Sequence, residues 1–434
     1  MKSRYAVIGL FGLWFLLILG SFFKYSLSVD PFFGTTRNVV NRYQKRGDIK
    51  DRQGEILAYG SGLARRYTLG AAGSPIIGVA RPEIGVEGVI EREYGERLIG
   101  SRKSKLWYML NQSNDGYPLK TTLDKDMQAT AYHAMKNYSG AIVVMKLNGE
   151  VLASLSSPTY DPNKMNNKYY DRLKNHPERP LFNRAFDGRY EPGSAWKSAI
   201  AISLLEGNCR DKAVLCNGSL TVGNKVIRCM KAHGVVKNMA DALTMSCNVW
   251  FMQTALAELD GEKMRKSFVR FMSRPLKEVM TPEDTALAAI GQGEVLVSPL
   301  ELAQLAAAIG NKGMRPEPRL MKENIKLAKV IDEKIADKLS SMMSMVVKKG
   351  TAKGLAGFQK KGFFVAAKTG TAERDTPKGK INTAVLIGFA GASKNKPDFA
   401  FSVVIEDAPG YGGTVCVPVM KEILDFYFAK GQGK

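Results

Sequence analysis

The sequence predicts an α+β fold, in which helices flank a central antiparallel sheet. Segments with helical periodicity precede and follow a group of strand-like segments, which is typical of this class. The 434 residues, 45% of them hydrophobic and 24% charged, also give room for two or three domains and a large buried core. The expected helices cover residues 123–137, 194–205, 240–257, 331–347 and 415–428, and the expected strands cover residues 140–145, 149–155, 364–368, 382–388 and 399–405.

The N-terminal segment predicts a membrane anchor within residues 1–24. Residues 6–23 read AVIGLFGLWFLLILGSFF, with Lys2 and Arg4 before this apolar run and Lys24 after it. The run is just long enough to span a bilayer and longer than the usual apolar part of a signal peptide. A cleaved signal peptide is the alternative. Because basic residues lie on both sides, the positive-inside rule does not orient the segment.

Residues 25–120 predict a small β-rich module. They contain many glycines, arginines and short β-prone pieces, and no long helical period runs through them. Residues 46–58 read RGDIKDRQGEILA, in which Asp51 and Arg52 stand just before Gly54. Charge-assisted hydrogen bonds from such a pair can fix a turn, so we expect this module to have a structural role.

A larger domain is expected from residue 121 onward. Asp124 is placed to cap the helix at residues 123–137, and Asn148 and Gly149 form a turn signal between two strand-like runs. This pattern predicts a helix followed by a β-hairpin.

A serine and a lysine three residues apart stand at the start of an alanine-rich helix. Residues 191–201 read EPGSAWKSAIA, which places Ser194 and Lys197 on the same helix face. A lysine can activate a serine if burial and nearby cations keep its amine neutral. The helix start also offers free backbone N–H groups to an oxyanion. Alone, this spacing occurs by chance in most chains of such length.

Two further motifs make chance a poor explanation. Residues 246–248 read Ser-Cys-Asn, and residues 368–371 read Lys-Thr-Gly-Thr after a buried strand. Positions i and i+2 do not share a helix face, so the Ser-Cys-Asn motif must lie in a loop between two helical pieces. With its three motifs in this order, the chain resembles the class B penicillin-binding proteins, which are peptidoglycan D,D-transpeptidases.

The resemblance implies a serine acyl-enzyme mechanism. Ser194 attacks the carbonyl group between two D-alanines of a stem peptide, and Lys197 takes its proton. Ser246 relays that proton toward the departing D-alanine, while Asn248 holds Lys197 and the substrate amide. The N–H groups of Ser194 and Thr371 form the oxyanion hole, and β-lactams are expected as covalent inhibitors.

The resemblance also implies a carboxylate site at the third motif. The positive charge of Lys368 is expected to keep the Lys197 amine neutral. Together with the hydroxyl groups of Thr369 and Thr371, it attracts the terminal carboxylate of the peptide. Gly370 leaves space for close backbone approach.

The domain organisation follows the same resemblance. Residues 1–24 are a single-pass anchor in the cytoplasmic membrane, residues 25–120 a stalk, and residues 121–434 the transpeptidase domain on the extracytoplasmic, periplasmic side. The short signatures at residues 46–58 and 88–100 match the N-terminal module of the family. The chain has no room for a glycosyltransferase domain, so a multi-pass SEDS-type glycosyltransferase is the expected partner.

The composition argues against other classes of function, such as nucleic-acid binding and Ser-His-Asp catalysis. The net charge of +22 favours an anionic neighbourhood, such as membrane phospholipid or cell-wall polymer. No zinc-finger spacing, aromatic RNA-binding box or dense arginine tail is present, so nucleic acid is not an expected partner. The three histidines, His133, His176 and His233, lie outside any nucleophile-elbow context, in agreement with a serine–lysine mechanism. No cofactor is expected.

The five cysteines lack paired C-x-x-C spacing, which argues against zinc and predicts no metal site. They are Cys209, Cys216, Cys229, Cys247 and Cys416. If this part of the chain lies outside the cytoplasm, Cys216 and Cys229 are the expected disulfide, because they bracket a turn-rich hairpin. Two free buried thiols are the alternative.

Three rival functions share these motifs or this architecture. A serine β-lactamase of class A needs a glutamate that activates water, in a Glu-x-x-x-Asn pattern after the second motif. Glu283 has no such partner, so transfer to an amine is favoured over hydrolysis in a β-lactamase or β-lactam sensor. A D,D-carboxypeptidase also fits the chemistry, but the signature at residues 46–58 and the anchor favour the transpeptidase. A non-catalytic scaffold of a wall-building complex remains open.

Overall fold

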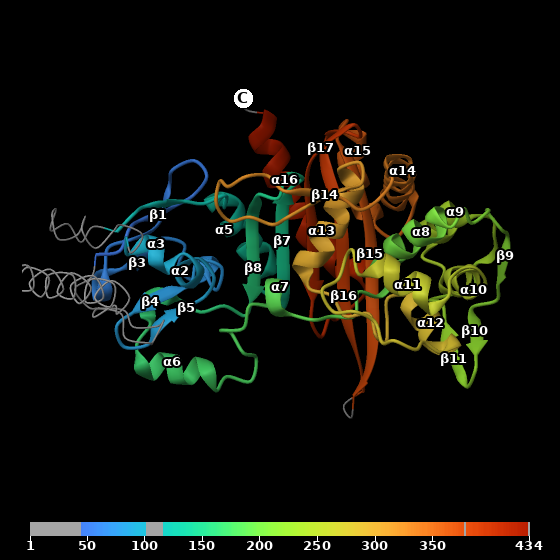
Figure 1. Cartoon of the computed structure of the whole chain (residues 1–434), viewed down its shortest axis with the longest axis horizontal. Helices are drawn as coiled ribbons and strands as arrows, with labels where there is room; N and C mark the ends of the chain where they lie inside the picture. Colours follow the sequence, from blue (N-terminus) through green and yellow to red (C-terminus); the bar gives the residue numbers. More distant parts are fainter. Residues whose placement is uncertain (1–44, 101–115, 377–378, 433–434) are drawn as a thin grey trace, which may run out of the picture.

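The structure of the chain is a computed structural model that describes residues 45–100, 116–376 and 379–432. The expected anchor at residues 6–23 lies outside these ranges. Within them, no helix combines the length and the apolar character needed to cross a membrane. Figure 1 shows an elongated body with a small sheet at one end, a large sheet in the middle and a group of helices at the other end.

The central sheet is antiparallel, as predicted, and has the strand order β15-β16-β17-β7-β8. A tight turn with Gly149 at φ +93° joins β7 to β8, as the sequence also predicted. The strands are β7 (Gly140–Lys146), β8 (Val151–Ser157), β15 (Phe364–Thr376), β16 (Gly379–Ser393) and β17 (Lys396–Ile405).

Strands β15 and β16 are longer than their apolar patterns predicted. Their ladder runs from the pair Phe364–Gly391 to the pair Thr376–Gly379. The apolar pattern marks only the part that the core buries, whereas backbone pairing continues into polar residues. The third motif therefore lies inside a long strand, and the paired ends of β15 and β16 extend beyond the rest of the sheet (Figure 1).

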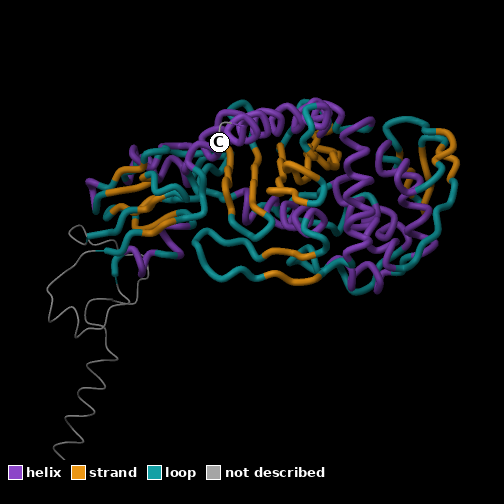
Figure 2. The backbone as a smooth tube through the Cα atoms, turned by 90° about the horizontal axis from the view of Figure 1, so that it is seen from above, coloured by secondary structure: helices purple, strands orange, loops and turns teal. Residues whose placement is uncertain are grey.

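Helices cover both faces of the sheet. Helices α5 (Lys125–Met135) and α16 (Gly412–Gln432) pack against each other on one face, and α13 (Pro299–Gly310) packs against β17, β16 and β7 on the other. Figure 2 shows the strands between these two layers. The predicted cap of α5 is confirmed, since the Asp124 carboxylate accepts a hydrogen bond from the Met127 N–H at 3.1 Å.

A second, smaller sheet lies at the N-terminal end, with the strand order β3-β2-β1-β6. After β3, the chain forms the hairpin β4–β5 and the short helices α2 and α3. It then returns to the small sheet as strand β6, which is parallel to β1 and leads into the larger domain. Their bounds are β1 (Ile49–Lys50), β2 (Ile56–Tyr59), β3 (Arg66–Tyr67), β4 (Val79–Arg81), β5 (Gly85–Glu87), α2 (Ile90–Glu93), α3 (Gly95–Leu98) and β6 (Leu119–Lys120).

The Asp51 side chain fixes the turn between β1 and β2. Its Oδ1 accepts hydrogen bonds from the backbone N–H groups of Gln53, Gly54 and Glu55 at 2.8–2.9 Å. The predicted structural turn is therefore present. Arg52 takes no part in it and instead forms an ion pair with Glu150, at 3.7 Å, in the larger domain.

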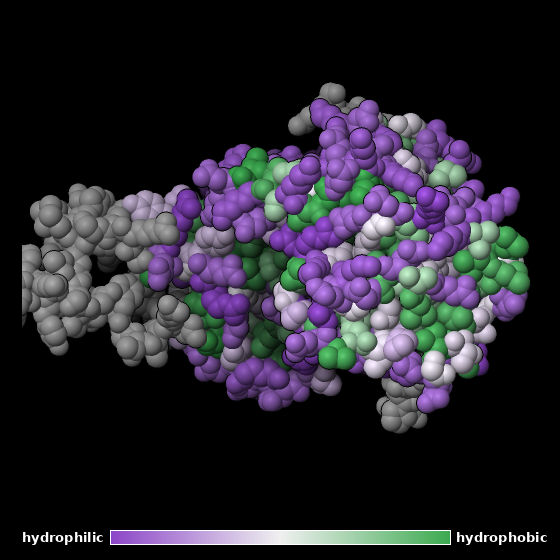
Figure 3. Space-filling view, turned by 45° about the vertical axis from the view of Figure 1, so that its right-hand side comes forward, coloured by the Kyte–Doolittle hydropathy of each residue, from purple (hydrophilic) through white to green (hydrophobic). Residues whose placement is uncertain are grey.

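The opposite end of the molecule is a mostly helical lobe that carries two of the three motifs. Figure 3 shows hydrophobic side chains gathered on the surface at this end. The lobe contains η4 (Gly193–Trp196), α8 (Lys197–Glu206), β9 (Val214–Cys216), β10 (Ser219–Val222), β11 (Lys225–Arg228), β12 (Gly234–Val236), α9 (Met239–Met245), α10 (Asn248–Glu258), α11 (Gly261–Phe268) and α12 (Pro282–Ala289).

The remaining elements connect these parts. Helix α14 (Glu333–Lys349) packs along β15 and also contacts α8 and α9, so it ties the lobe to the sheet. These elements are α6 (Asn167–Lys174), α7 (Arg184–Asp187), β13 (Met314–Pro316), β14 (Leu327–Lys329), α14 (Glu333–Lys349) and α15 (Ala356–Lys360).

Candidate active site

Ser194 and Lys197 lie together where the chain enters α8. Ser194 belongs to the 3₁₀ turn η4, and Lys197 is the first residue of the helix. The Lys197 Nζ lies 3.0 Å from the Ser194 Oγ. Ser194 is half-buried, whereas Lys197 is fully buried, because residues 197–204 all face the core. The hydroxyl group is therefore accessible from outside while its neighbouring amine is shielded from water.

Glycines let the nucleophile turn approach strand β15 backbone to backbone. Gly193 has φ +52°, and a Cβ atom there would lie 2.4 Å from the Thr371 oxygen and 2.9 Å from the Thr371 nitrogen. A Cβ atom at Gly370 would lie 2.2 Å from the Pro192 oxygen. Since no side chain fits at either place, both positions require glycine. The expected reason for Gly370 agrees with this geometry.

The second motif forms the turn between α9 and α10, as its spacing predicted. Ser246 follows α9 with left-handed angles, φ 60° and ψ 40°, and Asn248 begins α10. Lys197 Nζ donates to Asn248 Oδ1 at 2.6 Å and to the Ser246 carbonyl oxygen at 2.8 Å. The Asn248 side chain donates in turn to the Arg228 carbonyl oxygen at 2.7 Å. This second bond fixes the orientation of the amide.

Lys368 completes the group from strand β15. Its Nζ donates to Ser246 Oγ at 2.9 Å and to the Thr369 carbonyl oxygen at 2.9 Å. The Lys197 Nζ lies 3.5 Å from the same Ser246 hydroxyl. One hydroxyl group thus stands between two buried amines, and a continuous series of contacts leads from Ser194 to Lys368.

Burial controls the charge of both amines. It lowers the pKa of Lys197 from 10.5 to about 7. It also lowers the pKa of Lys368 well below its ordinary value, and the charge of Lys197 lowers it further. The charge of Lys368 was expected to keep Lys197 neutral, whereas in the structure it is desolvation that lowers the pKa of Lys197. Within the described residues, neither amine forms an ion pair with a carboxylate.

The two threonines of the third motif have different surroundings. Thr369 is buried, and its hydroxyl lies 2.5 Å from the hydroxyl of Thr351. Thr371 is half-buried, donates to the Gly370 carbonyl oxygen at 2.8 Å and accepts from the Gly412 N–H at 3.2 Å. Sequence reasoning missed Thr351 and Gly412, because neither lies in a motif and only packing brings them to β15.

The expected disulfide is not present. Cys216 and Cys229 bracket the β10–β11 hairpin as predicted, but their sulfur atoms lie 3.6 Å apart and all five cysteines are free thiols. The alternative of free thiols therefore describes the structure. Cys247 lies in the same group, next to the catalytic candidates Ser246 and Asn248.

Comparison with known proteins gives consistent relatives. The chain is 27% identical over 406 residues to the peptidoglycan D,D-transpeptidase PbpA of Mycolicibacterium smegmatis, covering 81% of this chain and 79% of that protein. It is 27% identical over 403 residues to FtsI of Escherichia coli, also named a peptidoglycan D,D-transpeptidase, covering 83% of this chain and 66% of the relative.

Solved structures support the same fold. Penicillin-binding protein A of M. tuberculosis, solved as a ceftriaxone acyl-enzyme complex, superposes with a TM-score of 0.78 at 24% sequence identity. The match covers 88% of this chain and 98% of that one. The model of the penicillin binding protein transpeptidase domain matches residues 140–425, which contain all three motifs. The chain therefore belongs to the penicillin-binding protein transpeptidase family, as its motifs predicted.

Proposed function

We propose that this protein cross-links peptidoglycan stem peptides through an acyl-enzyme on Ser194, with Lys197 as the base. Family membership makes the chain a serine-type D,D-transpeptidase, and the predicted activity is confirmed at that level. One observation carries the assignment of residues. A fully buried amine without a carboxylate partner among the described residues lies 3.0 Å from the Ser194 hydroxyl.

Acylation begins with proton transfer to Lys197. Near its pKa of about 7, a large fraction of the amine is neutral and can accept the Ser194 proton. The Ser194 oxygen then bonds to the carbonyl carbon between the two D-alanines, and the N–H groups of Ser194 and Thr371 receive the negative charge on the carbonyl oxygen. When the C–N bond breaks, the leaving amine takes a proton through Ser246.

The third motif supplies substrate binding. Lys368 has no protein carboxylate partner among the described residues, so the terminal carboxylate of a stem peptide or of a β-lactam can take that place and favour the charged form of this buried amine. The half-buried hydroxyl of Thr371 can donate to the same carboxylate if it gives up its bond to the Gly370 carbonyl oxygen. The buried hydroxyl of Thr369 acts through its contact with Thr351.

Transfer to an amine completes the reaction. The amine of a neighbouring stem peptide attacks the acyl carbon, the new amide bond forms, and Ser194 leaves with its proton restored. Attack by water instead would make the protein a D,D-carboxypeptidase. The names of the relatives support transfer, because both are transpeptidases.

The same proposal covers the rest of the chain. Residues 1–24 anchor it in the cytoplasmic membrane, residues 25–120 form a stalk, and residues 121–434 form the extracytoplasmic transpeptidase domain. The position of β6 (Leu119–Lys120), which closes the N-terminal sheet and leads into α5, supports the boundary near residue 120. A multi-pass SEDS-type glycosyltransferase supplies the glycan strands.

Labelling with a fluorescent penicillin tests this assignment. Ser194→Ala removes the hydroxyl that forms the acyl bond, so covalent labelling should be lost while the melting temperature stays unchanged. Ser198→Ala is a matched control, because this serine lies four residues further on and its buried hydroxyl has no hydrogen-bond partner among the described residues. It should label like the unmodified protein. Labelling that persists in a folded Ser194→Ala protein would refute the proposal.

A further inference from the structure

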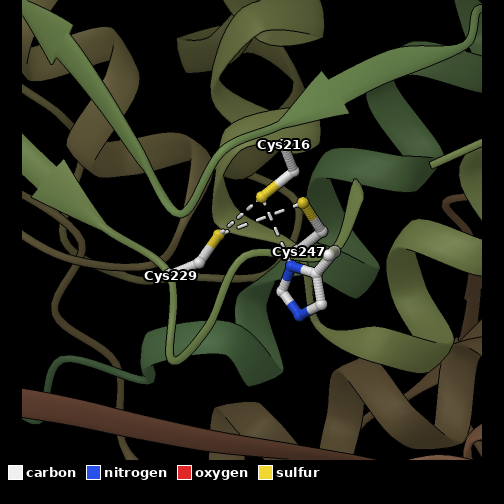
Figure 4. Close-up of side chains that lie close together, drawn as sticks. Cys216, Cys229 and Cys247 are labelled. Atoms are coloured by element: carbon white, nitrogen blue, oxygen red, sulfur yellow. Dashed lines mark hydrogen bonds between the residues drawn. The ribbon is translucent and has the colours of Figure 1, made fainter. Parts of the chain in front are cut away.

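Four metal-ligating side chains converge beside the second motif. They are Cys216, Cys229, His233 and Cys247, and their ligand atoms all lie within 4.8 Å of one another. Figure 4 shows the three thiol groups pointing toward a common centre. Cys216 and Cys247 are buried, while Cys229 and His233 are half-buried, which leaves one side open to solvent.

Three of the six spacings between these atoms match the edges of a zinc tetrahedron, and the other three are at most 4.8 Å. With Zn–S bonds of about 2.3 Å and Zn–N bonds of about 2.0 Å, tetrahedral geometry separates two sulfurs by about 3.8 Å and a sulfur from a nitrogen by about 3.5 Å. The sulfur of Cys216 lies 3.6 Å from that of Cys229 and 3.4 Å from His233 Nδ1. The sulfurs of Cys229 and Cys247 are 3.9 Å apart. A single ion fits at the centre.

Backbone N–H groups are already directed at two of the sulfurs. Cys229 Sγ accepts from the N–H groups of Asn248, at 3.1 Å, and Val249, at 3.5 Å. Cys247 Sγ accepts from the Trp250 N–H at 3.4 Å. These donors come from the first turn of α10, where partial positive charge favours thiolates over thiols. They serve as the outer hydrogen bonds that orient metal ligands.

The ligands come from four separate places in the lobe. Cys216 ends β9, Cys229 follows β11, His233 precedes β12, and Cys247 caps α10. The expectation of no metal site rested on the absence of C-x-x-C pairs. That pattern arises when two ligands share one tight loop, whereas here the packing of α10 against two small sheets, β9–β12 and the β10–β11 hairpin, brings single ligands together.

We propose that Cys216, Cys229, His233 and Cys247 bind one Zn²⁺ ion, which holds the turn carrying Ser246 and Asn248 in place. Three cysteines and one histidine in tetrahedral arrangement are a closed, structural zinc site. The thiols that remain protonated release their protons as the metal binds. Since Cys247 lies between Ser246 and Asn248 in the chain, a bond from its sulfur to the metal restrains both neighbours.

Metal content tests the site itself. The purified full chain should contain one zinc per molecule by mass spectrometry. Co²⁺ in its place should give the intense visible bands of tetrahedral cobalt and a thiolate-to-metal charge-transfer band. Cys229→Ser and His233→Ala should lose zinc, whereas Cys209→Ser and Cys416→Ala, outside the cluster, should keep it. The site would be overturned by a cobalt spectrum typical of six-coordinate geometry. It would also be overturned if Cys216 and Cys229 form a disulfide and the reduced protein binds no zinc.

Acylation kinetics test the positioning role, which rests on the proposed function. Removal of zinc by a chelator should slow labelling by fluorescent penicillin at least tenfold, and added Zn²⁺ should restore the rate. Unchanged labelling of the zinc-free protein would refute positioning, although the site would stand. Absence of labelling in the zinc-loaded protein would count against the proposed function and leave the metal measurement unaffected.

Discussion

Two groups of buried basic side chains lie in different parts of this molecule. In the N-terminal module, the Glu91 carboxylate accepts from Arg46 Nε at 2.6 Å and from Arg65 Nε at 2.5 Å. All three side chains are buried. In the active site, Lys197 and Lys368 are just as buried, but they share a hydroxyl group rather than a carboxylate.

The difference teaches how residue type and partner set the charge of a buried group. Arginine does not lose its proton in proteins, so a buried guanidinium needs a counter-charge. Burial by itself would raise the pKa of Glu91, but Arg46 and Arg65 outweigh it and lower this pKa. Lysine can lose its proton instead, so burial without an acid yields the neutral amine that catalysis uses. The first group stabilises the fold, and the second is kept ready to react.

Lys197→Met should break the active-site side of this comparison most strongly. The substitution removes the base but fills similar space with an apolar chain. We expect acylation by penicillin to slow by about 10²–10⁴-fold, the usual contribution of a general base. The free energy of unfolding should change little, because the lost hydrogen bonds to Ser246 and Asn248 are offset by the removal of a buried amine that is costly to desolvate. Stopped-flow acylation and urea unfolding measure the two effects, and a rate within threefold of the original would contradict the role.

Glu91→Gln should have the opposite effects, with lower stability and an unchanged acylation rate. It leaves Arg46 and Arg65 buried without a counter-charge, so the free energy of unfolding should fall by about 3–5 kcal/mol. Acylation per folded molecule should stay the same. Glu93→Gln, an exposed position on the same helix, is the control for loss of one negative charge. Equal stability of the two variants in urea would show that the buried network does not stabilise the fold.

The pH dependence of acylation should sharpen the contrast. Because the pKa of Lys197 is about 7, its neutral fraction, and with it the acylation rate, should be roughly tenfold lower at pH 6 than at pH 8. A flat profile across this range would contradict a lysine base.

Stability should depend on pH in two separate windows. The first window lies between pH of about 7, the lowered pKa of Lys197, and pH 10.5, its ordinary pKa. In this window Lys197 is protonated in the unfolded chain and neutral in the folded one, so the free energy of unfolding rises with pH. The stability that ionised Glu91 contributes is present above its ordinary pKa of 4.5 and is lost as pH falls through the lowered value.

The smallest effect is expected at Thr351. Thr351→Val keeps the shape of the side chain but removes the hydroxyl that contacts Thr369. The loss of one hydrogen bond is worth about 1 kcal/mol, so the second-order rate constant of acylation should fall by about fivefold. Thr130→Val is the control, because its exposed hydroxyl lies on α5 and bonds only within that helix. An unchanged rate constant would remove Thr351 from the site.

Several parts of the fold and site could be read from local pattern. The caps, the β7–β8 turn, the break at the second motif and the spacing of Ser194 and Lys197 depend on neighbouring residues, so the sequence indicates them directly. The length of β15 could not be read in this way, because its outer part is held by pairing with β16 rather than by burial of its own side chains. The Asp51 turn was expected, whereas the pairing of Arg52 with Glu150 was not.

By itself, the sequence determined the family and the order of the motifs and supplied the proposed reacting groups, since each of these is written within a few consecutive residues. Only the tertiary structure decided that Glu91 neutralises two arginines, that Thr351 meets Thr369, and that three cysteines and a histidine share one centre. These contacts join residues far apart in the chain, and packing of separate elements sets the distances between them. The same packing removes water from two lysines, and so lowers the pKa values of both amines.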